Sequence, residues 1–414
     1  MPAGLHLIFD KSALQSFSLD ETNWLDHFYM TVITPLFFAE VLADLEKEIG
    51  RGRTPEQIVG ELALKTPDMN STPCTHHHQI ALSVLFGNDM PMDGRIPRDH
   101  GRVVELDGHQ GVFYSKSPEE DALDRWHKHE FLDVERQFAK SWRRNLCNVN
   151  HDKEYEYFQR WFLLGKPHSL PEVKTLTDAY LDASPQDGVM RFAIATLRLS
   201  GEAATEVMQR WRAAQSPPVR TYAPYVRHLL GVDLFCSLAT AADLIGRDRP
   251  KGKADNTVDM AYLYYLPFCH VFVSGDKLHK RTVPLFLRPD QTFVDAIEMK
   301  ADLAKLDAHY DELPAAEKTR GFHKIAKHPP LTGDYLIAKL WDKRGMEWRE
   351  NALKPDPLDP EKDKEIIAAL KRMSDMAKAT DAKSRPSLEE IMFMNITRTI
   401  QRTKGKWNRV SDEA

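Results

Sequence analysis

Two short apolar segments, far apart in the chain and each ending in an acid, constrain this fold more than any other sequence feature. Residues 6–9 run into Asp10, and residues 270–274 run through one glycine into Asp276. A brief apolar run that ends in a polar residue is typical of a buried parallel strand leading into a loop. Neither segment has enough neighbouring structure to bury itself, so we expect both strands to lie in one sheet.

The pattern around these strands divides the chain into four parts. Residues 1–66 and 255–300 alternate strand and helix signals, and together they are long enough for one α/β layer. Residues 67–254 read as a mainly helical insertion between the two halves. Residues 301–414 read as a helical C-terminal region with a basic tail. The predicted fold class is therefore α/β with a large helical insertion.

Local signals predict several further elements. Thr34 and Pro35 are typical of a helix start, and Ser117 begins another helix. The pair Asp107-Gly108 favours a turn between two strands. Residues 257–269 predict a helix that ends at Pro267, because proline disrupts a helix interior.

Composition and charge exclude several classes of protein. The 414 residues are 42% hydrophobic and 28% charged, which excludes fibrous and wholly disordered chains. The four cysteines are scattered, so a reducing, cytoplasmic compartment is expected rather than a disulfide framework. The N-terminus does not resemble a signal peptide, and the most apolar stretch, 261–273, is too short to span a bilayer, so no membrane partner is expected. The net charge of −5 gives no general affinity for nucleic acid, so RNA would need a local basic patch.

Four acids occupy positions where α/β proteins gather functional groups. Asp10 and Asp276 follow the two predicted strands, so in a parallel sheet both emerge at its carboxyl edge. Glu40 and Asp259 lie in helices with largely apolar neighbours, where an unpaired acid is costly. Acids gathered without cationic partners are stabilised by a hard divalent cation, and Mg²⁺ or Mn²⁺ held there can activate a water. Taken singly, each acid is more simply a helix cap or a surface charge.

The segments that carry these acids resemble the PIN-domain nucleases. LIFDKSALQS is similar to the opening strand of that family, TPLFFAEVLADL to its next helix, and VDMAYLYYLPFCHVFVSGDKLHKR to its late helix–strand unit. The resemblance implies a Rossmann-like three-layer α/β/α PIN-like core, here carrying the helical insertion. It also implies one or two Mg²⁺ or Mn²⁺ ions. The residues implied as catalytic groups and metal ligands are Asp10, Glu40, Asp259 and Asp276, with Ser12 and Ser274 in support.

This resemblance implies a hydrolase, a divalent-metal-dependent endoribonuclease that cuts RNA phosphodiester bonds. Two alternatives stay open. One is a PIN-like scaffold or binding protein without activity, favoured if the four acids fail to converge. The other is a metal phosphoesterase acting on DNA or a small molecule, favoured if the insertion roofs the site into a closed pocket. A homo-oligomer or a regulatory protein partner is compatible with each.

Two stretches combine basic and aromatic residues in a way that suits RNA. The first contains Lys140, Arg143 and Arg144 beside a tryptophan in the insertion, and the second contains Arg398 and Arg402 in an acid-free part of the tail. Such stretches can hold a phosphate backbone and stack a base. The alternative is that the tryptophans are core residues and the basic groups favour a helix C-terminus.

Other catalytic patterns find little support. The three consecutive histidines 76–78 would point in different directions in a helix or a strand, and His127 and His129 diverge on a helix, so a zinc hydrolase is disfavoured. The sequence contains no G-x-S-x-G, no P-loop and no G-x-G-x-x-G, which leaves serine hydrolases and nucleotide-binding proteins without their usual motifs.

Overall fold

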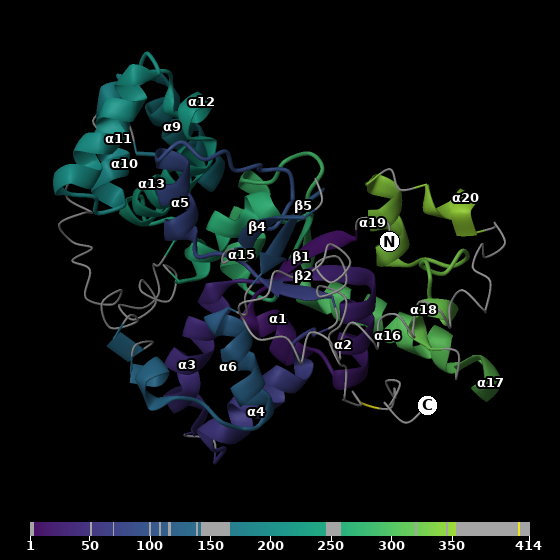
Figure 1. Ribbon diagram of the computed structural model, residues 1–414. Coiled ribbons are helices and arrows are strands. Elements are labelled where there is room, and N and C mark those ends of the chain that lie inside the picture. The colour runs from purple at the N-terminus through teal and green to yellow at the C-terminus, as the bar shows by residue number, and fades with distance from the viewer. Residues whose placement is uncertain are drawn as a thin grey trace.

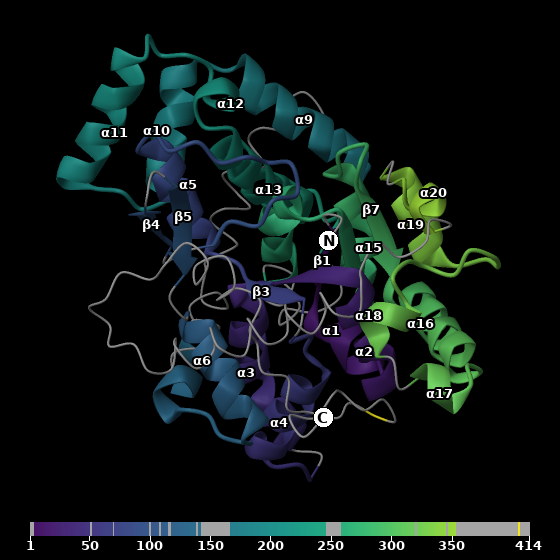
Figure 2. The same ribbon diagram turned by 45° about the vertical axis from the view of Figure 1, so that its right-hand side comes forward.

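The computed structural model has a five-stranded parallel sheet at its centre, with the strand order β3-β2-β1-β6-β7 (Figures 1 and 2). The two strands expected from the sequence are direct neighbours, with Leu7 opposite Val271 and Phe9 opposite Val273. The expectation of one α/β sheet is thereby confirmed. The strands are β1 (Leu5–Phe9), β2 (Tyr29–Ile33), β3 (Ser71–Pro73), β6 (Val271–Ser274) and β7 (Thr292–Asp295). The structure describes residues 4–49, 52–68, 70–98, 101–106, 109–114, 117–137, 140–141, 166–245, 258–318, 321–344, 347–352 and 405.

The order of the strands reverses between β1 and β6. From β1 the chain adds β2 and then β3 on one side, and it later returns to add β6 and β7 on the other. In such a sheet the connections leave β1 and β6 in opposite directions, which opens a crevice beyond the carboxyl ends of these two strands. Asp10 and Asp276 follow these strands, so both lie at the switch point.

Both faces of the sheet are buried by helices. Ile8, Val32 and Phe272 belong to the hydrophobic cluster on the first face, whereas Leu7 and Val273 belong to the cluster on the second. Successive side chains of a strand point to opposite faces, so runs that are apolar at every position require cover on both sides. Figures 1 and 2 show helices on either side of the sheet. The arrangement is compatible with a three-layer α/β fold.

The helices divide between the two clusters. The first cluster includes α5 (His77–Leu85), α9 (Leu170–Ala183), α10 (Gln186–Thr196), α11 (Gly201–Ala213), α12 (Val219–Tyr222), α13 (Pro224–Ala241), α15 (Lys277–Thr282) and the 3₁₀ helices η2 (Tyr262–Phe268) and η3 (Val283–Leu285). The second includes α1 (Lys11–Ser16), α2 (Leu19–Phe28), α3 (Pro35–Ile49), α4 (Pro55–Lys65), α6 (Pro118–His127), α16 (Ala296–Asp311), α18 (Phe322–Ile325), α19 (Leu336–Lys343) and α20 (Trp348–Ala352). The short helix α17 (Ala315–Lys318) contributes no buried residue.

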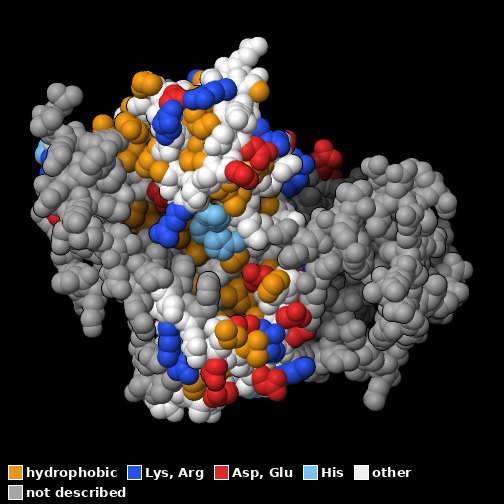
Figure 3. All heavy atoms as spheres, turned by 60° about the vertical axis from the view of Figure 1, so that its left-hand side comes forward, with side chains coloured by type: hydrophobic (Ala, Val, Ile, Leu, Met, Phe, Trp, Pro, Cys, Tyr) orange, Lys and Arg blue, Asp and Glu red, His pale blue; other side chains and the backbone are white. Residues whose placement is uncertain are grey.

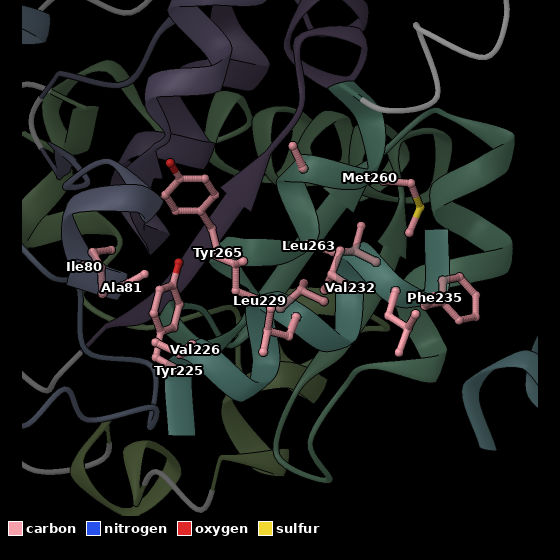
Figure 4. Close-up of a cluster of buried hydrophobic side chains, with 14 of the residues drawn as sticks. Ile80, Ala81, Tyr225, Val226, Leu229, Val232, Phe235, Met260, Leu263 and Tyr265 are labelled. Atoms are coloured by element: carbon pink, nitrogen blue, oxygen red, sulfur yellow. The ribbon is translucent and has the colours of Figure 1, made fainter. Parts of the chain in front are cut away.

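Helix α13 is the centre of the first cluster. Its Tyr225, Leu229 and Phe235 are buried and face α5 and the segment 258–268 (Figure 4). Apolar residues occur on most sides of this helix, which is typical of a helix enclosed by others. Truncating Phe235 to alanine would cost about 3 to 5 kcal/mol, the usual range for a large core side chain. Among the described residues, α13 and the remaining helices are all too short or too polar to cross a membrane.

The local signals in the sequence correspond to observed elements. Helix α3 starts at Pro35, and α6 starts after Ser117, whose side chain forms a capping box with Glu120. The strands β4 (Gly101–Leu106) and β5 (His109–Tyr114) pair antiparallel around positions 107–108, as the Asp-Gly turn predicts.

Two features differ from the expectations. The expected helix over 257–269 is a short α-helical turn at 258–261 followed by η2, and Pro267 lies inside η2 rather than at its end. A proline ring suits the dihedral angles of a tighter helix, and its missing N–H matters less in so short a piece. In addition, β3 lies within residues 67–254 and joins the sheet. A three-residue edge strand that contains Pro73 carries almost no local strand signal.

Candidate functional site

Asp10 is held rigidly at the end of β1. Its side chain is buried and caps α1 by accepting a hydrogen bond from the backbone N–H of Ala13 at 2.8 Å. The Ser12 hydroxyl donates to the same oxygen at 2.8 Å, and the Ser274 hydroxyl at the end of β6 donates to the other. Both serines expected to support Asp10 therefore contact it.

His279, on α15, is the partner of Asp10 that no motif in the sequence singles out. Its ring is fully buried, with Nδ1 at 3.3 Å from Asp10 Oδ2 and 2.7 Å from Ser274 Oγ, and Nε2 at 2.7 Å from the backbone oxygen of Asp259. With the Ser274 hydroxyl donating to Asp10, both ring nitrogens of His279 face oxygen atoms that can accept. This arrangement favours the imidazolium form of the ring.

The charges at this site agree with that assignment. Burial alone would lower the pKa of His279, but Asp10 and Asp259 raise it to about 9. Burial alone would raise the pKa of Asp10, but His279, Ser274 and the Ala13 N–H together lower it. Asp10 and His279 therefore form a buried ion pair.

Glu40 reaches the same edge from α3. Its carboxylate accepts a hydrogen bond of 2.8 Å from the hydroxyl of Tyr262, at the start of η2. Burial raises the pKa of Glu40, while the charge of Lys11 and the Tyr262 bond act in the opposite direction. Lys11 is itself buried and forms an ion pair of 2.9 Å with Asp44.

Asp259 and Asp276 complete the group of four acids. Burial and the charges of Asp276, Glu40 and Asp10 raise the pKa of Asp259 to about 7, although His279 acts against them. The other three carboxylates therefore lie within electrostatic reach of Asp259. Asp276 is partly exposed and caps α15 by accepting a hydrogen bond from a backbone N–H. Ser12 and Gly275 are exposed, so solvent reaches this edge.

The donor chemistry of this cluster suits a hard divalent cation, because several carboxylates are present and their mutual repulsion is only partly relieved. As they stand, however, no three His, Cys, Asp or Glu side chains in the described part of the chain converge on one point as metal ligands. Asp10 already accepts from two hydroxyls and His279, and Glu40 from Tyr262. Carboxylate oxygens have spare lone pairs, so these bonds can persist while an ion binds.

One of the five basic residues expected to bind RNA lies in the described part of the chain. Arg143, Arg144, Arg398 and Arg402 lie outside the described residues. Lys140 is described and is partly buried. Contact between RNA and these side chains remains a prediction.

The consecutive histidines have structural partners. His76 caps α5 by accepting from the backbone N–H of His78, and the ring of His77 lies 3.1 Å from the hydroxyl of Tyr265. Burial lowers the pKa of His76 and His77, which favours their neutral forms. Caps and hydrogen bonds thus account for these side chains without zinc.

An apolar groove of about 500 Å³ begins beside His76. Figure 3 shows histidine side chains next to hydrophobic surface on this side of the molecule. The groove also borders Ala39, the residue before Glu40 on α3. The groove and Glu40 therefore lie on adjacent faces of the same helix. Its lining is Pro35, Leu36, Phe38, Ala39, Leu42, His76, Pro118, Glu119, Ala122, Val134 and Glu135.

Comparison with known proteins adds no assignment, because no family model, no curated protein and no solved structure matches this chain. Function is therefore inferred from the fold and the site alone.

Proposed function

We propose that this protein is a PIN-like, divalent-metal-dependent nuclease that hydrolyses RNA phosphodiester bonds. One observation carries the proposal: four acids from separate parts of the chain gather at the switch point of a parallel sheet, and each of Asp10, Glu40 and Asp276 raises the pKa of Asp259. Ligand sites of open α/β sheets lie at that position. Buried acids that repel one another gain most from a cation shared among them.

Asp10, Glu40, Asp259 and Asp276 are the residues that would hold Mg²⁺ or Mn²⁺. When bound, such an ion lowers the pKa of a water and stabilises charge on phosphodiester oxygens. Ser12 and Ser274 hold the Asp10 carboxylate in one orientation through their hydroxyls. An acid held so firmly keeps its position during a reaction, which is what a preorganised site requires.

Asp259 is the group best suited to move a proton. Its pKa of about 7 lies near neutral pH, where an acid can both accept and release a proton efficiently. Its side chain is partly exposed, so a water can reach it. With no ion bound, Asp259 is therefore the acid of this group that exchanges its proton near neutral pH.

The apolar groove favours a second candidate, a metal phosphoesterase that acts on a small molecule with an apolar portion. A volume of about 500 Å³ lies within the usual range for small-molecule pockets. Among the residues that the structure describes, the groove lining contains no lysine or arginine, so it would hold the apolar portion and not the phosphate. An inactive scaffold is the third candidate, and activity measurements separate the three.

The test is cleavage of single-stranded RNA, single-stranded DNA and a chromogenic phosphodiester, each with Mn²⁺ or with EDTA. The proposal expects metal-dependent cleavage of RNA, reduced at least about 100-fold by Asp276→Asn, because an amide oxygen is a weaker ligand. Asp334→Asn is the control. Asp334 is an exposed acid just before α19 and is not one of the four site acids, so its substitution should leave cleavage unchanged. Cleavage of only the small diester favours the second candidate, and no cleavage of any substrate by folded protein overturns both.

A further inference from the structure

Helix α1 carries an uncharged polar face that leads away from the proposed site. Its exposed residues are Ser12, Gln15 and Ser16, which share one face because they are three and four positions apart. Ser12 lies beside the acids, where its hydroxyl donates to Asp10 and accepts from the backbone N–H of Gly275 at 3.3 Å. With a rise of about 1.5 Å per residue, Ser16 lies about 6 Å further along the helix. This face therefore joins the mouth of the site to the C-terminal end of α1 without a charge that would repel a polyanion.

Two lysines from separate helices meet at that C-terminal end. Helix α1 lies against both α4 and α16 (Figure 1). Lys65 of α4 donates to the backbone oxygen of Gln15 at 2.9 Å, and Lys300 of α16 donates to the backbone oxygen of Ser16. Burial and the charge of Lys300 lower the pKa of Lys65, which agrees with two like charges held within electrostatic reach of each other.

Nearby acids neutralise this pair of cations only in part. Lys300 is 44% exposed and forms an ion pair of 3.2 Å with Glu21, a carboxylate that also closes the capping box of α2. Glu61 acts on Lys65 from a distance but is itself paired with Arg53. Among the residues that the structure describes, no carboxylate contacts the ammonium group of Lys65, which is partly exposed. A positive charge therefore remains at this end of α1.

Helix capping explains these lysines only in part. An ammonium group at a helix C-terminus satisfies backbone oxygens and is favoured by the helix dipole. Two such groups at the end of a six-residue helix also repel each other, as the lowered pKa of Lys65 shows. A negatively charged ligand would relieve this repulsion, in the same way that a divalent cation would relieve the repulsion among the acids.

We propose that Lys65 and Lys300, with the exposed face of α1, hold the phosphate backbone of single-stranded RNA next to the four acids. This inference rests on the proposed function, because it takes RNA to be the substrate. The two lysines bind phosphates beside the one that is cleaved, while Gln15 and Ser16 offer hydrogen bonds to the same strand. The chain as a whole carries a charge of −5, so RNA needs such a local basic patch.

The experiment measures binding of a fluorescently labelled single-stranded oligouridine in EDTA over a range of salt concentrations. Lys65→Gln combined with Lys300→Gln should weaken binding roughly tenfold and lower the slope of log affinity against log salt by about 1.4, because each phosphate contact on a single strand contributes about 0.7. Lys65→Arg combined with Lys300→Arg keeps both charges and should retain the parent slope.

The matched control is Lys166→Gln combined with Arg191→Gln. It removes two exposed cations, each paired with an acid, from the helical insertion, so the net charge changes by the same amount. Its affinity and slope should equal those of the parent. Cleavage in Mn²⁺, measured in parallel, should show a raised KM and little change in kcat in the double lysine-to-glutamine variant, because the lost contacts serve binding.

Unchanged affinity and salt slope in the lysine-to-glutamine variant, or an equal loss in the control, would overturn the inference and leave the proposed nuclease standing. A loss of thermal stability without a loss of affinity would do the same, since that is the result of capping alone. If the double variant folds poorly, Lys300→Gln alone should still lower the slope by about 0.7. Folded parent protein that binds RNA through these lysines but does not cleave it in Mn²⁺ would instead overturn the proposed function.

Discussion

Asp10 and His279 are in contact at the carboxyl edge of the sheet, although 269 positions separate them in the chain. Their charged atoms lie 3.3 Å apart and both side chains are buried. The net contribution of a buried ion pair to stability is small, but removing one partner leaves the other charge buried and unpaired. Several measurable properties of the protein follow from this pair.

Asp10→Asn should destabilise the protein, because it leaves the His279 imidazolium without its counter-charge. The expected loss in free energy of unfolding is about 3 kcal/mol, within the usual range for a broken buried pair. Asp276→Asn should change it by less than about 0.5 kcal/mol, because asparagine caps a helix as well as aspartate does. Urea unfolding at pH 7 in EDTA compares the two variants, and equal stabilities would argue against the buried pair.

Stability should fall as the pH rises from 6.5 to about 9. The pKa of His279 is raised from 6.5 to about 9 in the folded protein, so the folded state binds the proton more tightly than the unfolded state. The stabilisation is complete below pH 6.5 and is lost as the pH rises through 9, for a total on the order of 3 kcal/mol. Chemical unfolding at several pH values measures it. The slope should be much smaller in His279→Gln, and an equal slope in both proteins would assign the effect to other groups.

Asp259→Asn should stabilise the protein at pH 8 but not at pH 4. The pKa of Asp259 is raised from 3.8 to about 7, so ionising this acid in the folded state costs free energy that the amide avoids. The gain at pH 8 should be about 1 to 2 kcal/mol once partial exposure of the side chain is allowed for. RNA cleavage should be lost in the same variant. Thermal unfolding at the two pH values is the measurement, and a gain of equal size at both would contradict the assigned charge.

Gly94→Ala should destabilise the protein more than Gly87→Ala does. Both glycines have a positive φ, +94° and +95°, so either substitution strains the backbone by about 1 kcal/mol. At Gly94 the new Cβ would also lie 2.3 Å from Nε2 of His270, whose buried ring stacks on His6, whereas at Gly87 it meets no atom within 4 Å. An additional loss of about 2 kcal/mol is expected from the clash. Thermal midpoints of the two variants test it, and equal midpoints would mean that His270 moves aside freely.

Elements whose signals lie within a few residues could be predicted from the sequence. The strand before Asp10, the helix that Pro35 opens and the helix that begins after Ser117 depend on neighbouring residues only, because periodicity and caps act over one or two turns. The strand β3 and the 3₁₀ form of η2 could not be predicted this way. Each depends on pairing or packing with distant segments, which outweighs a proline that locally disfavours it.

The place of Asp10 and Asp276 at one edge of the sheet could be predicted from the sequence alone, because each follows an apolar run and parallel strands bring such positions to one edge. Tertiary structure decided their partners and their charges. Only the pairing of β1 with β6 sets Ser274 against Asp10, and only the burial of α15 places His279 beside them. A histidine three residues after an acid is ordinary in any sequence. Here the ring is buried beside the buried carboxylate of Asp10, and a buried carboxylate without a counter-charge is costly, so the protonated form of the ring is favoured. Burial of both groups exists only in the folded chain.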